Sequence, residues 1–431
     1  MPDATAHTPS RRFRNIIGGS AGNLVEWFDW YVYSAFALYF AHIFFPSGDR
    51  TVELLQTTVV FAIGFLFRPI GAWAMGVYAD RKGRKAGLML SVSLMCIGSL
   101  MIAVAPSYAS AGLFSPAILL IARIIQGLSL GGEYGSSATY LSEMADRERR
   151  GFWSSFQYVT IIGGQLTALA LLVVLQASIG DAAMKEWGWR IGFAAGAVLA
   201  IVVYFIRRRL DETLSYENIA TRVDRRRSTL GTLFRDHPRE AFLVMALTAG
   251  GTAAFYAYTI YLQKFLANTS GFDTVTASRI MTVALTIMLF LGPIAGRISD
   301  FVGRKPLMIF FGVGATLFTY PIFVTLEHTH NPIVAFALVM ATLVIVSGYT
   351  SINAIIKAEM FPADIRALGV ALPFAISNAI FGGTAESIAL CMKKIHHERW
   401  FYIYISLLAA CSLVAYVRMR ETKTTSLIEE D

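Results

Sequence analysis

Residues 76–85 read Gly-Val-Tyr-Ala-Asp-Arg-Lys-Gly-Arg-Lys, and residues 296–305 read Gly-Arg-Ile-Ser-Asp-Phe-Val-Gly-Arg-Lys. The two glycines, the aspartate, the arginine and the final lysine match at a constant offset of 220 residues. Two shorter echoes have nearly the same offset: Gly163-Gly164 with Gly382-Gly383, and Glu143-Met144 with Glu359-Met360. Three echoes at nearly one offset indicate that the chain contains two copies of one structural unit.

The composition places both copies in a membrane. Of the 431 residues, 55% are hydrophobic and only 15% are charged, and the mean hydropathy is +0.55. A soluble domain of this length would expose too much apolar surface, and a spanning helix needs about 20 mostly apolar residues. Twelve such stretches are predicted, at residues 16–40, 54–79, 87–105, 116–142, 152–177, 189–206, 240–266, 276–296, 306–325, 332–356, 367–391 and 400–417.

A charged segment separates the two copies. Residues 207–239 contain nine arginines and no long apolar run, so we predict a solvated cytoplasmic linker there. One bundle of six helices would then occupy residues 1–206, and a second would occupy residues 240–431. The predicted fold is all-α and integral to the membrane, with twelve transmembrane helices in two pseudo-symmetric bundles. In transporters built from such repeats, the substrate site lies between the halves near mid-membrane.

The net charge of +8 reports topology, and we expect no nucleic acid partner. With a cytoplasmic start, most of the 37 Lys and Arg residues fall in the predicted cytoplasmic segments. This positive-inside bias puts both termini in the cytoplasm and is typical of a bacterial inner-membrane protein. Residues 1–14 are largely polar and run directly into a full-length span, so no cleavable signal peptide is expected.

Each repeated segment closes a very short cytoplasmic turn. Glycine supplies the backbone conformations that a tight reversal needs. The aspartate can lie at a helix N-terminus, where its charge is favourable to the free backbone N–H groups. A plain charged turn would explain one copy, but two aligned copies favour a gating element.

Ionisable residues inside spans are costly and indicate function. In the first span Glu26, Asp29 and Tyr33 share one helical face, and in the fourth Arg123 and Glu133 fall in one sector. At ~1.5 Å per residue, Asp29 and Arg123 both lie about 20 Å from the cytoplasmic side of a ~30 Å core. We therefore expect these two side chains to meet near the midplane.

We interpret this charge as a proton-coupling network. A carboxylate that loses its arginine partner takes up a proton more readily. If substrate competes for Arg123, then Asp29 or Glu26 becomes able to take a proton, and Glu133 is the third candidate. A static ion pair that fixes helix packing is the alternative. Because Val339 stands opposite Arg123 in the second copy, the buried charge that couples proton to substrate is expected to be concentrated in the first half.

Several motifs resemble the major facilitator superfamily. The repeated segments are similar to its signature loop, and residues 22–29, 65–71 and 123–134 resemble motifs of its metabolite:proton symporter family. The resemblance covers almost the whole chain and implies that each loop latches the cytoplasmic side closed. The implied latch residues are Gly76, Asp80, Arg81, Gly83 and Arg84 in the first copy, and Asp300, Gly303 and Arg304 in the second. The second latch is expected to be the weaker, because Phe301 stands where the first copy has Arg81.

The family resemblance implies a proton-coupled symporter that imports α-ketoglutarate or a similar small dicarboxylate by alternating access of the two halves. Citrate, shikimate and zwitterionic-osmolyte symporters of the same family are the alternatives. A sensor or a membrane enzyme is the alternative of a different class, but the sequence has no P-loop or His-x-x-x-His motif. We expect a monomer that uses the proton gradient, with no cofactor or metal, and a packing role for Cys96, Cys391 and Cys411.

A buried dicarboxylate needs cations and hydrogen-bond donors around it. Arg123 is the first candidate, since a guanidinium can hold a carboxylate with two hydrogen bonds, and Arg68 is the second. Arg190 and Lys357 lie near span ends, so an interfacial anchor or a gate is their alternative role. The predicted substrate-binding residues are Arg123, Arg68, Asn23, Tyr33, Gln157, Gln165, Tyr256, Asn378, Arg190 and Lys357.

Overall fold

The computed structural model describes the backbone of residues 9–82, 84–143, 145, 147–208, 230–362 and 365–428. Within these ranges it describes all side chains except those of residues 9–21, 76–77, 79–85, 87–88, 132–133, 135–137, 139–141, 143 and 367. The described backbone is helical and contains no strand.

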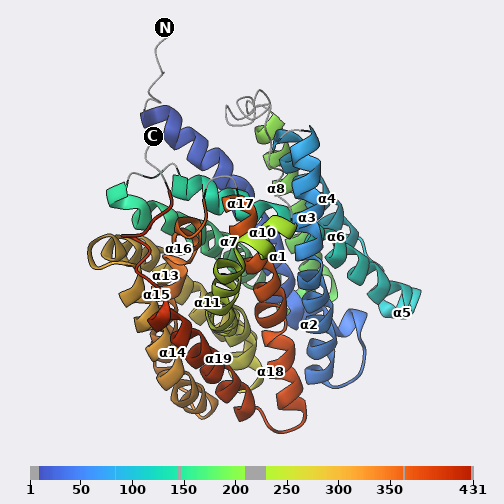
Figure 1. Ribbon diagram of the computed structural model, residues 1–431. Helices are drawn as coiled ribbons and strands as arrows, with labels where there is room; N and C mark the ends of the chain where they lie inside the picture. Colours follow the sequence, from blue (N-terminus) through green and yellow to red (C-terminus); the bar gives the residue numbers. More distant parts are fainter. Residues whose placement is uncertain are drawn as a thin grey trace.

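The first half of the chain forms six long helical segments (Figure 1). Its helices are α1 (Pro9–Phe44), α2 (Arg50–Leu66), α3 (Arg68–Lys82), α4 (Arg84–Ala103), α5 (Tyr108–Ala111), α6 (Phe114–Glu143), α7 (Arg150–Ala183) and α8 (Trp189–Arg208). A 3₁₀ turn, η1 (Arg147–Arg149), precedes α7, and a π-helical turn, η2 (Met184–Gly188), follows it. The helices α2 and α3 together form one span.

The second half repeats this arrangement. Its helices are α10 (Leu230–Asp236), α11 (Pro238–Tyr256), α12 (Leu262–Asn268), α13 (Thr274–Val302), α14 (Arg304–Glu327), α15 (Pro332–Thr350), α16 (Asn353–Glu359), α17 (Arg366–Ser377), α18 (Ala385–Lys394) and α19 (Arg399–Arg418). Two π-helical turns lie between helices of this half. The first, η3 (Ala257–Tyr261), joins α11 to α12, and the second, η4 (Asn378–Gly382), follows α17 and leads to α18.

Local chemistry explains where several helices begin. The carboxylate of Asp49 accepts hydrogen bonds from the backbone of Thr51 and Val52 at the start of α2. Asp273 caps α13 in the same way, and Asn331 caps α15 ahead of a proline at the first helical position. Such caps satisfy backbone N–H groups that have no partner inside the helix.

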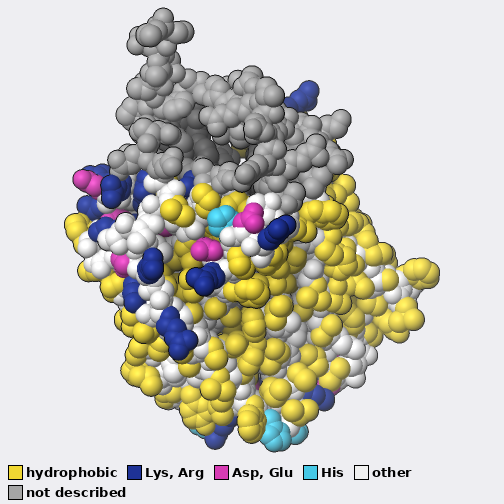
Figure 2. Space-filling view, in the orientation of Figure 1, with side chains coloured by type: hydrophobic (Ala, Val, Ile, Leu, Met, Phe, Trp, Pro, Cys, Tyr) yellow, Lys and Arg dark blue, Asp and Glu magenta, His cyan; other side chains and the backbone are white. Residues whose placement is uncertain are grey.

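The twelve predicted spans are confirmed. Within the described part of the chain, nine helical stretches are long and apolar enough to cross a membrane, and one of them, Arg147–Arg208, contains both α7 and α8. The shorter apolar stretch Met89–Ala103 in α4 and the 36-residue α1 complete the twelve. A broad hydrophobic belt covers the visible face of the molecule, with most of the charged side chains gathered towards one end (Figure 2).

The sequence analysis missed the interruptions within these spans. The turn at Phe67 separates α2 from α3 directly before Pro69, whose ring cannot continue the backbone hydrogen bonds of a helix. In the second half, η3 and η4 interrupt two further spans with π-helical turns. Interruptions of this kind are frequent at functional sites, because they re-aim side chains and carbonyl groups.

The two bundles meet along α7 with α13, α2 with α18, and α6 with α17. Within the first bundle glycine allows very close packing: a Cβ on Gly127 would lie 2.1 Å from the carbonyl oxygen of Gly64, and one on Gly131 would lie 2.1 Å from that of Arg68. This approach of α6 to α2 and α3 brings the polar face of α6 to the middle of the molecule. The start of α1 and the segment after α19 lie at one end of the molecule (Figure 1).

Candidate functional site

A narrow cavity lies between the two bundles. Residues from α1, α3, α6, α17 and η4 line it: Asn23, Glu26, Trp27, Arg68, Leu130, Gly131, Tyr134, Ala371, Phe374, Ala375 and Asn378. Its volume is about 20 Å³, which is close to the minimum that one water molecule needs. The bundles must therefore separate before a larger molecule can enter.

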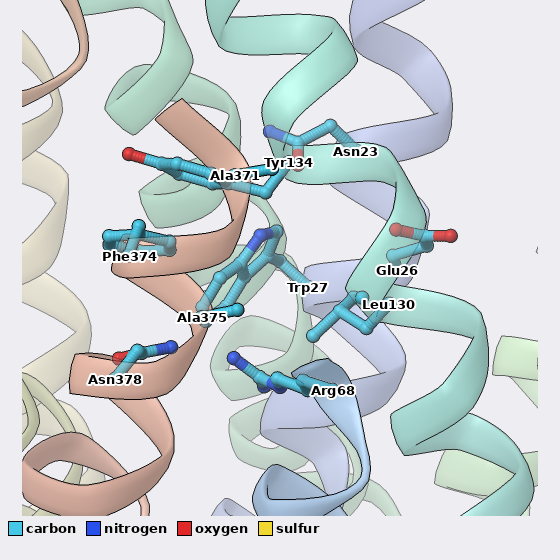
Figure 3. Close-up of a pocket in the computed structure, with 11 residues that line it drawn as sticks. Asn23, Glu26, Trp27, Arg68, Leu130, Tyr134, Ala371, Phe374, Ala375 and Asn378 are labelled. Atoms are coloured by element: carbon cyan, nitrogen blue, oxygen red, sulfur yellow. The ribbon is translucent and has the colours of Figure 1, made fainter. Parts of the chain in front are cut away.

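Arg68 and Asn378 point toward each other across this cavity from the two bundles (Figure 3). The guanidinium carbon of Arg68 lies 3.7 Å from the ring centroid of Phe65 and 4.3 Å from that of Trp30. Its Nε and Nη2 atoms are buried and have no hydrogen-bond partner among the described residues, and Nδ2 of Asn378 is in the same situation. Tyr256 lies beside both side chains. Buried donors without acceptors are uncommon, so their convergence on one cavity indicates a binding site for an acceptor-rich molecule.

The expected meeting of Asp29 and Arg123 takes place through Gln126. Nη1 of Arg123 donates to Oε1 of Gln126 at 2.7 Å, and Nε2 of Gln126 donates to Oδ2 of Asp29 at 2.5 Å. Ser99 donates to the other oxygen of Asp29. All of these side chains are buried. Gln126 therefore bridges the guanidinium of Arg123 and the carboxylate of Asp29.

Trp30 lies against both buried arginines. The guanidinium carbon of Arg123 is 3.7 Å from the Trp30 centroid and 4.3 Å from the Tyr33 centroid. Nε and Nη2 of Arg123 have no hydrogen-bond partner in the described part of the chain. Stacking on an aromatic face stabilises a cation without occupying its N–H donors. Both arginines are thus held in place with donors left over.

Of the two other predicted coupling carboxylates, Glu26 has a side chain that the structure describes. Glu26 accepts a hydrogen bond from Ser91 at 2.9 Å, and its carboxylate turns away from Arg68 (Figure 3). Ser91 also contacts Ser129 on α6, so Glu26 faces the packing between α1, α4 and α6. The side chain of Glu133 lies outside the described residues.

Lys357 brings a further buried cation to the interface. Its Nζ lies 3.8 Å from the ring centroid of Phe374 and 3.5 Å from the hydroxyl of Tyr134, and its side chain is 1% exposed. The rings of Tyr134 and Phe374 stack at 3.8 Å across the two bundles. The described residues place no carboxylate against this ammonium group. Lys357 therefore packs behind two residues of the cavity wall, Tyr134 and Phe374, whereas the sequence placed it only near a span end.

The remaining predicted substrate residues are divided between the interface and the framework. Nδ2 of Asn23 donates to Thr160 at 2.6 Å, which ties α1 to α7 beside Gln157. Tyr33 donates to the backbone of α2 while its ring supports Arg123. Gln165 is buried in α7, and neither atom of its amide has a hydrogen-bond partner among the described residues.

Arg190 is not brought to the cavity. Its Nη1 donates to the carbonyl oxygens of Ala103 and Ala105 at 2.9 and 2.7 Å, and its guanidinium stacks on Trp189. These carbonyl groups end α4, where an arginine satisfies backbone acceptors that have no partner inside the helix. The residue thus stabilises a helix end, which corresponds to the anchor role given above as its alternative.

The chain matches a family model described as "Sugar (and other) transporter" in two overlapping stretches, residues 15–234 and 213–431. It is 53% identical over 421 residues to the alpha-ketoglutarate permease of Escherichia coli (strain K12), covering 97% of this chain and 96% of that protein. The chain belongs to the sugar (and other) transporter family. It is a multi-pass membrane transporter.

Further relatives agree with this membership. A citrate-proton symporter of Salmonella typhi is 32% identical over 96% of this chain and 97% of that protein. The solved structure of the major facilitator superfamily proton:xylose symporter XylE of E. coli aligns with a TM-score of 0.75 at 20% identity, covering 97% of this chain and 98% of that one. The predicted major facilitator fold is confirmed.

In this transporter the second predicted latch lies at a contact between the bundles. The carboxylate of Asp300 accepts hydrogen bonds from the backbone N–H groups of Gly151 and Phe152, at 2.8 and 3.0 Å, at the N-terminus of α7. Nη1 of Arg304 donates to the same carboxylate at 2.9 Å, and its Nη2 lies 3.7 Å from Glu359. A negative charge at a helix N-terminus is favourable, so Asp300 joins α13 to α7.

The segment after α19 supports this latch. The carboxylate of Glu421 accepts from the backbone of Arg304 and Lys305, at 2.8 and 3.0 Å, and so caps α14. Thr422 donates to Glu359 at 2.6 Å. Gly303 joins α13 to α14 with a φ of +99°, a conformation that side chains disfavour. The first latch cannot be compared with it, because the side chains of Gly76, Asp80, Arg81, Gly83 and Arg84 lie outside the described residues.

Buried charge is not confined to the first half. Lys264 in α12 and Glu386 in α18 form a buried ion pair, and Lys357 in α16 is a further buried charge of the second bundle besides those of the latch. The alignment at Arg123 compared only single positions on α6 and α15. The second bundle carries its charge at other positions. Lys264 could have been found as a lone cation inside an apolar span.

Proposed function

We propose that this transporter imports α-ketoglutarate, or a similar small dicarboxylate, together with protons across the bacterial inner membrane by alternating access of its two bundles. The observation that carries this proposal is the convergence of unpartnered donors from Arg68 and Asn378 on a cavity between the bundles. The 53% identity to a protein named alpha-ketoglutarate permease supports the choice of substrate.

The cations on both sides of the interface suit a substrate with a negative charge at each end. Arg68 and Arg123 belong to the first bundle, and Lys357 belongs to the second. A carboxylate bound between Arg68 and Asn378 would give acceptors to donors that now have none. Binding to both bundles favours closure of the cavity around the substrate, which is the step that alternating access requires.

Asp29 is our choice for the proton-carrying group. Its carboxylate is fully buried and linked to Arg123 only through Gln126. If substrate draws the guanidinium away, Gln126 loses its acceptor role and Asp29 loses the nearby positive charge, so protonation becomes more favourable. Protonation and substrate binding are then coupled thermodynamically, and each favours the other.

The same proposal covers the surroundings of the transporter. We propose that both termini face the cytoplasm, that the protein acts as a monomer in the bilayer, and that it needs no cofactor beyond the proton gradient. Citrate is the second candidate substrate, because two citrate-proton symporters are 32% and 30% identical to this chain. A third carboxylate would need a further cation at the cavity wall.

Uptake into proteoliposomes tests the proposal. The purified protein should accumulate labelled α-ketoglutarate when an inward proton gradient is imposed, and a protonophore should abolish accumulation but leave exchange intact. Unlabelled succinate and citrate compete as comparison substrates, with empty liposomes as the control. Accumulation that continues unchanged without the gradient would contradict proton coupling, and the absence of counterflow with any carboxylate would contradict the substrate class.

A further inference from the structure

The buried ion pair of the second bundle has no role in the site described so far. The side chains of Lys264 and Glu386 are 1% and 3% exposed. Nζ of Lys264 also donates to Oγ of Ser34 on α1, in the first bundle, at 2.8 Å. Taking two charges out of water costs about as much as their attraction returns, or more. Helix packing alone therefore gives no reason for this pair.

The pair lies farther along the interface than the cavity, toward the end that the topology predicts to be external. Glu386 follows Asn378 by eight residues in the same span, which corresponds to roughly 12 Å of helix. Tyr33 lies within electrostatic range of both Glu386 and Arg123, and its ring is one of those on which Arg123 stacks. The cation of Lys264 is thus followed along the interface by those of Arg123 and Arg68.

Contacts between the bundles cover the pair. Besides the bond from Lys264 to Ser34, the hydroxyl of Tyr31 donates to the backbone carbonyl of Thr259 at 3.0 Å. Both contacts join α1 to the span that contains η3 and α12. Separation of the bundles at this end must break them, and Lys264 would then face the widening path.

We propose that Lys264 binds a carboxylate of the substrate at the external side of this transporter. When the external side closes, the protein's own carboxylate, Glu386, replaces the substrate on Lys264. An ammonium group has three donors and no acceptor, so it needs an anion in either state. With the external side open, a substrate carboxylate binds Lys264 in exchange for Glu386. When the substrate moves inward to Arg123 and Arg68, Glu386 and Ser34 again occupy Lys264 and hold this side closed.

The exchange also accounts for selection of substrates with two carboxylates. Because Tyr33 contacts Arg123 and lies within electrostatic range of Glu386, the proposed path lets a molecule charged at both ends engage Lys264 and Arg123 together, whereas a monocarboxylate engages only one of them. This inference rests on the proposed transport of a small dicarboxylate. It adds a residue that selects the substrate before the substrate reaches the central cavity.

Uptake of labelled α-ketoglutarate into right-side-out membrane vesicles tests the exchange, with succinate and pyruvate as competitors. In Glu386→Gln the side chain that competes with the substrate for Lys264 is neutral. The KM for external substrate should therefore fall about tenfold, which is the effect of one charge-assisted contact. In the double variant Lys264→Gln/Glu386→Gln the KM should rise above wild type by about the same factor, and the preference for succinate over pyruvate should shrink.

Lys393→Gln is the matched control. Lys393 lies on the same helix as Glu386, near its outer end, but donates to the backbone of Asn268 and to Thr269 within the second bundle. Its KM should stay within about twofold of wild type, as for most contacts away from a binding site. Gel filtration in detergent verifies that each variant folds. If the double variant does not fold, the KM of Glu386→Gln alone tests the proposed exchange.

Two outcomes would overturn this inference and leave the proposed function intact. One is a wild-type or higher external KM in Glu386→Gln. The other is a folded double variant with the wild-type KM and the wild-type preference between succinate and pyruvate, which would make the pair a packing element. A wild-type protein that transports no carboxylate would overturn the proposed function and this inference with it.

Discussion

The buried arginines of the first bundle and the Lys264–Glu386 pair of the second are held in different ways. In the first bundle Arg68 and Arg123 stack on Trp30 and neighbouring rings, and each keeps two nitrogens without a hydrogen-bond partner in the described residues. In the second bundle Lys264 is neutralised directly by Glu386. The first arrangement leaves donors available to a substrate, whereas the second is complete until another anion replaces Glu386.

This difference shows how a repeated fold can support unequal roles. The two halves share their helix order and the sequence of their latch loops, but Lys264 and Lys357 stand at positions that do not correspond to those of Arg68 and Arg123. Cation–π contacts can hold a guanidinium in an apolar interior without using its donors. In a buried ion pair the donors of the cation are already occupied, so the pair favours the arrangement in which the external side is closed. The first bundle therefore offers donors to the substrate, whereas the second bundle can both bind the substrate and hold the external side closed.

The largest effect is expected from removing the central cation. Arg123→Gln should lower α-ketoglutarate uptake by roughly 10- to 100-fold, because a charge-assisted bond in a dry site contributes about 1.5–3 kcal/mol. Arg190→Gln is the control, since Arg190 caps α4 away from the cavity. Similar losses in both variants would mean that the stacked arginine of the first bundle has no special role.

Asp29→Asn should separate proton movement from substrate exchange. The neutral amide can still contact Ser99 and Gln126 but cannot take up a proton, so gradient-driven accumulation should be lost while counterflow persists. The measurement compares the two assays in the same proteoliposomes. Asp181→Asn, which removes an exposed ion pair with Lys185, is the control. Wild-type accumulation in Asp29→Asn would move the coupling role to Glu26 or Glu133.

A smaller effect is expected at the second latch. Asp300→Asn removes the negative charge from the N-terminus of α7, where a carboxylate cap stabilises by about 1 kcal/mol. Hydrogen exchange at the amides of Gly151 and Phe152 should rise about fivefold, as the α7–α13 contact opens more often. Glu327→Gln, which removes the exposed partner of Arg399, should leave those amides unchanged. Unaltered exchange in both variants would show that Asp300 does not hold the bundles together.

The smallest effect is expected at the exposed bridge between Asp49 and Lys394, which joins α2 of one bundle to α18 of the other. The hydrogen bond from Lys394 lowers the pKa of Asp49. The bridge therefore favours closure at pH values above the ordinary carboxyl pKa of about 3.9, and this contribution is lost as the pH falls through the lowered value.

Because the carboxylate stays ionised at physiological pH, Asp49→Asn should change the external KM by less than about twofold, with no pH dependence between roughly pH 5 and 8. The KM for α-ketoglutarate at pH 5, 6.5 and 8 provides the measurement. A pH-dependent change as large as that expected for Glu386→Gln would place the external gate at the surface instead of at the buried pair.

Much of the fold could be predicted because hydrophobic length and repetition are local properties of a chain. Each of the twelve helices begins and ends within a few residues of an apolar stretch, since the membrane interior demands internally satisfied backbone groups over about 20 residues. The interruptions at Phe67 and in η4 were missed because they involve only a few residues within otherwise apolar runs. They nevertheless place Arg68 and Asn378 at the cavity.

The sequence by itself determined the membrane solvent, the two six-helix copies and the repeated segments, and it brought Asp29 and Arg123 to one level of their helices, because period, length and charge bias are read along one chain. Only the tertiary structure decided that Gln126 stands between these two residues, that Lys357 packs against the cavity residues Tyr134 and Phe374 while Arg190 caps a helix, and that Lys264 meets Glu386. These contacts join residues far apart in sequence or on different helices, and the rotation of each helix about its axis, which packing sets, decides which side chains meet.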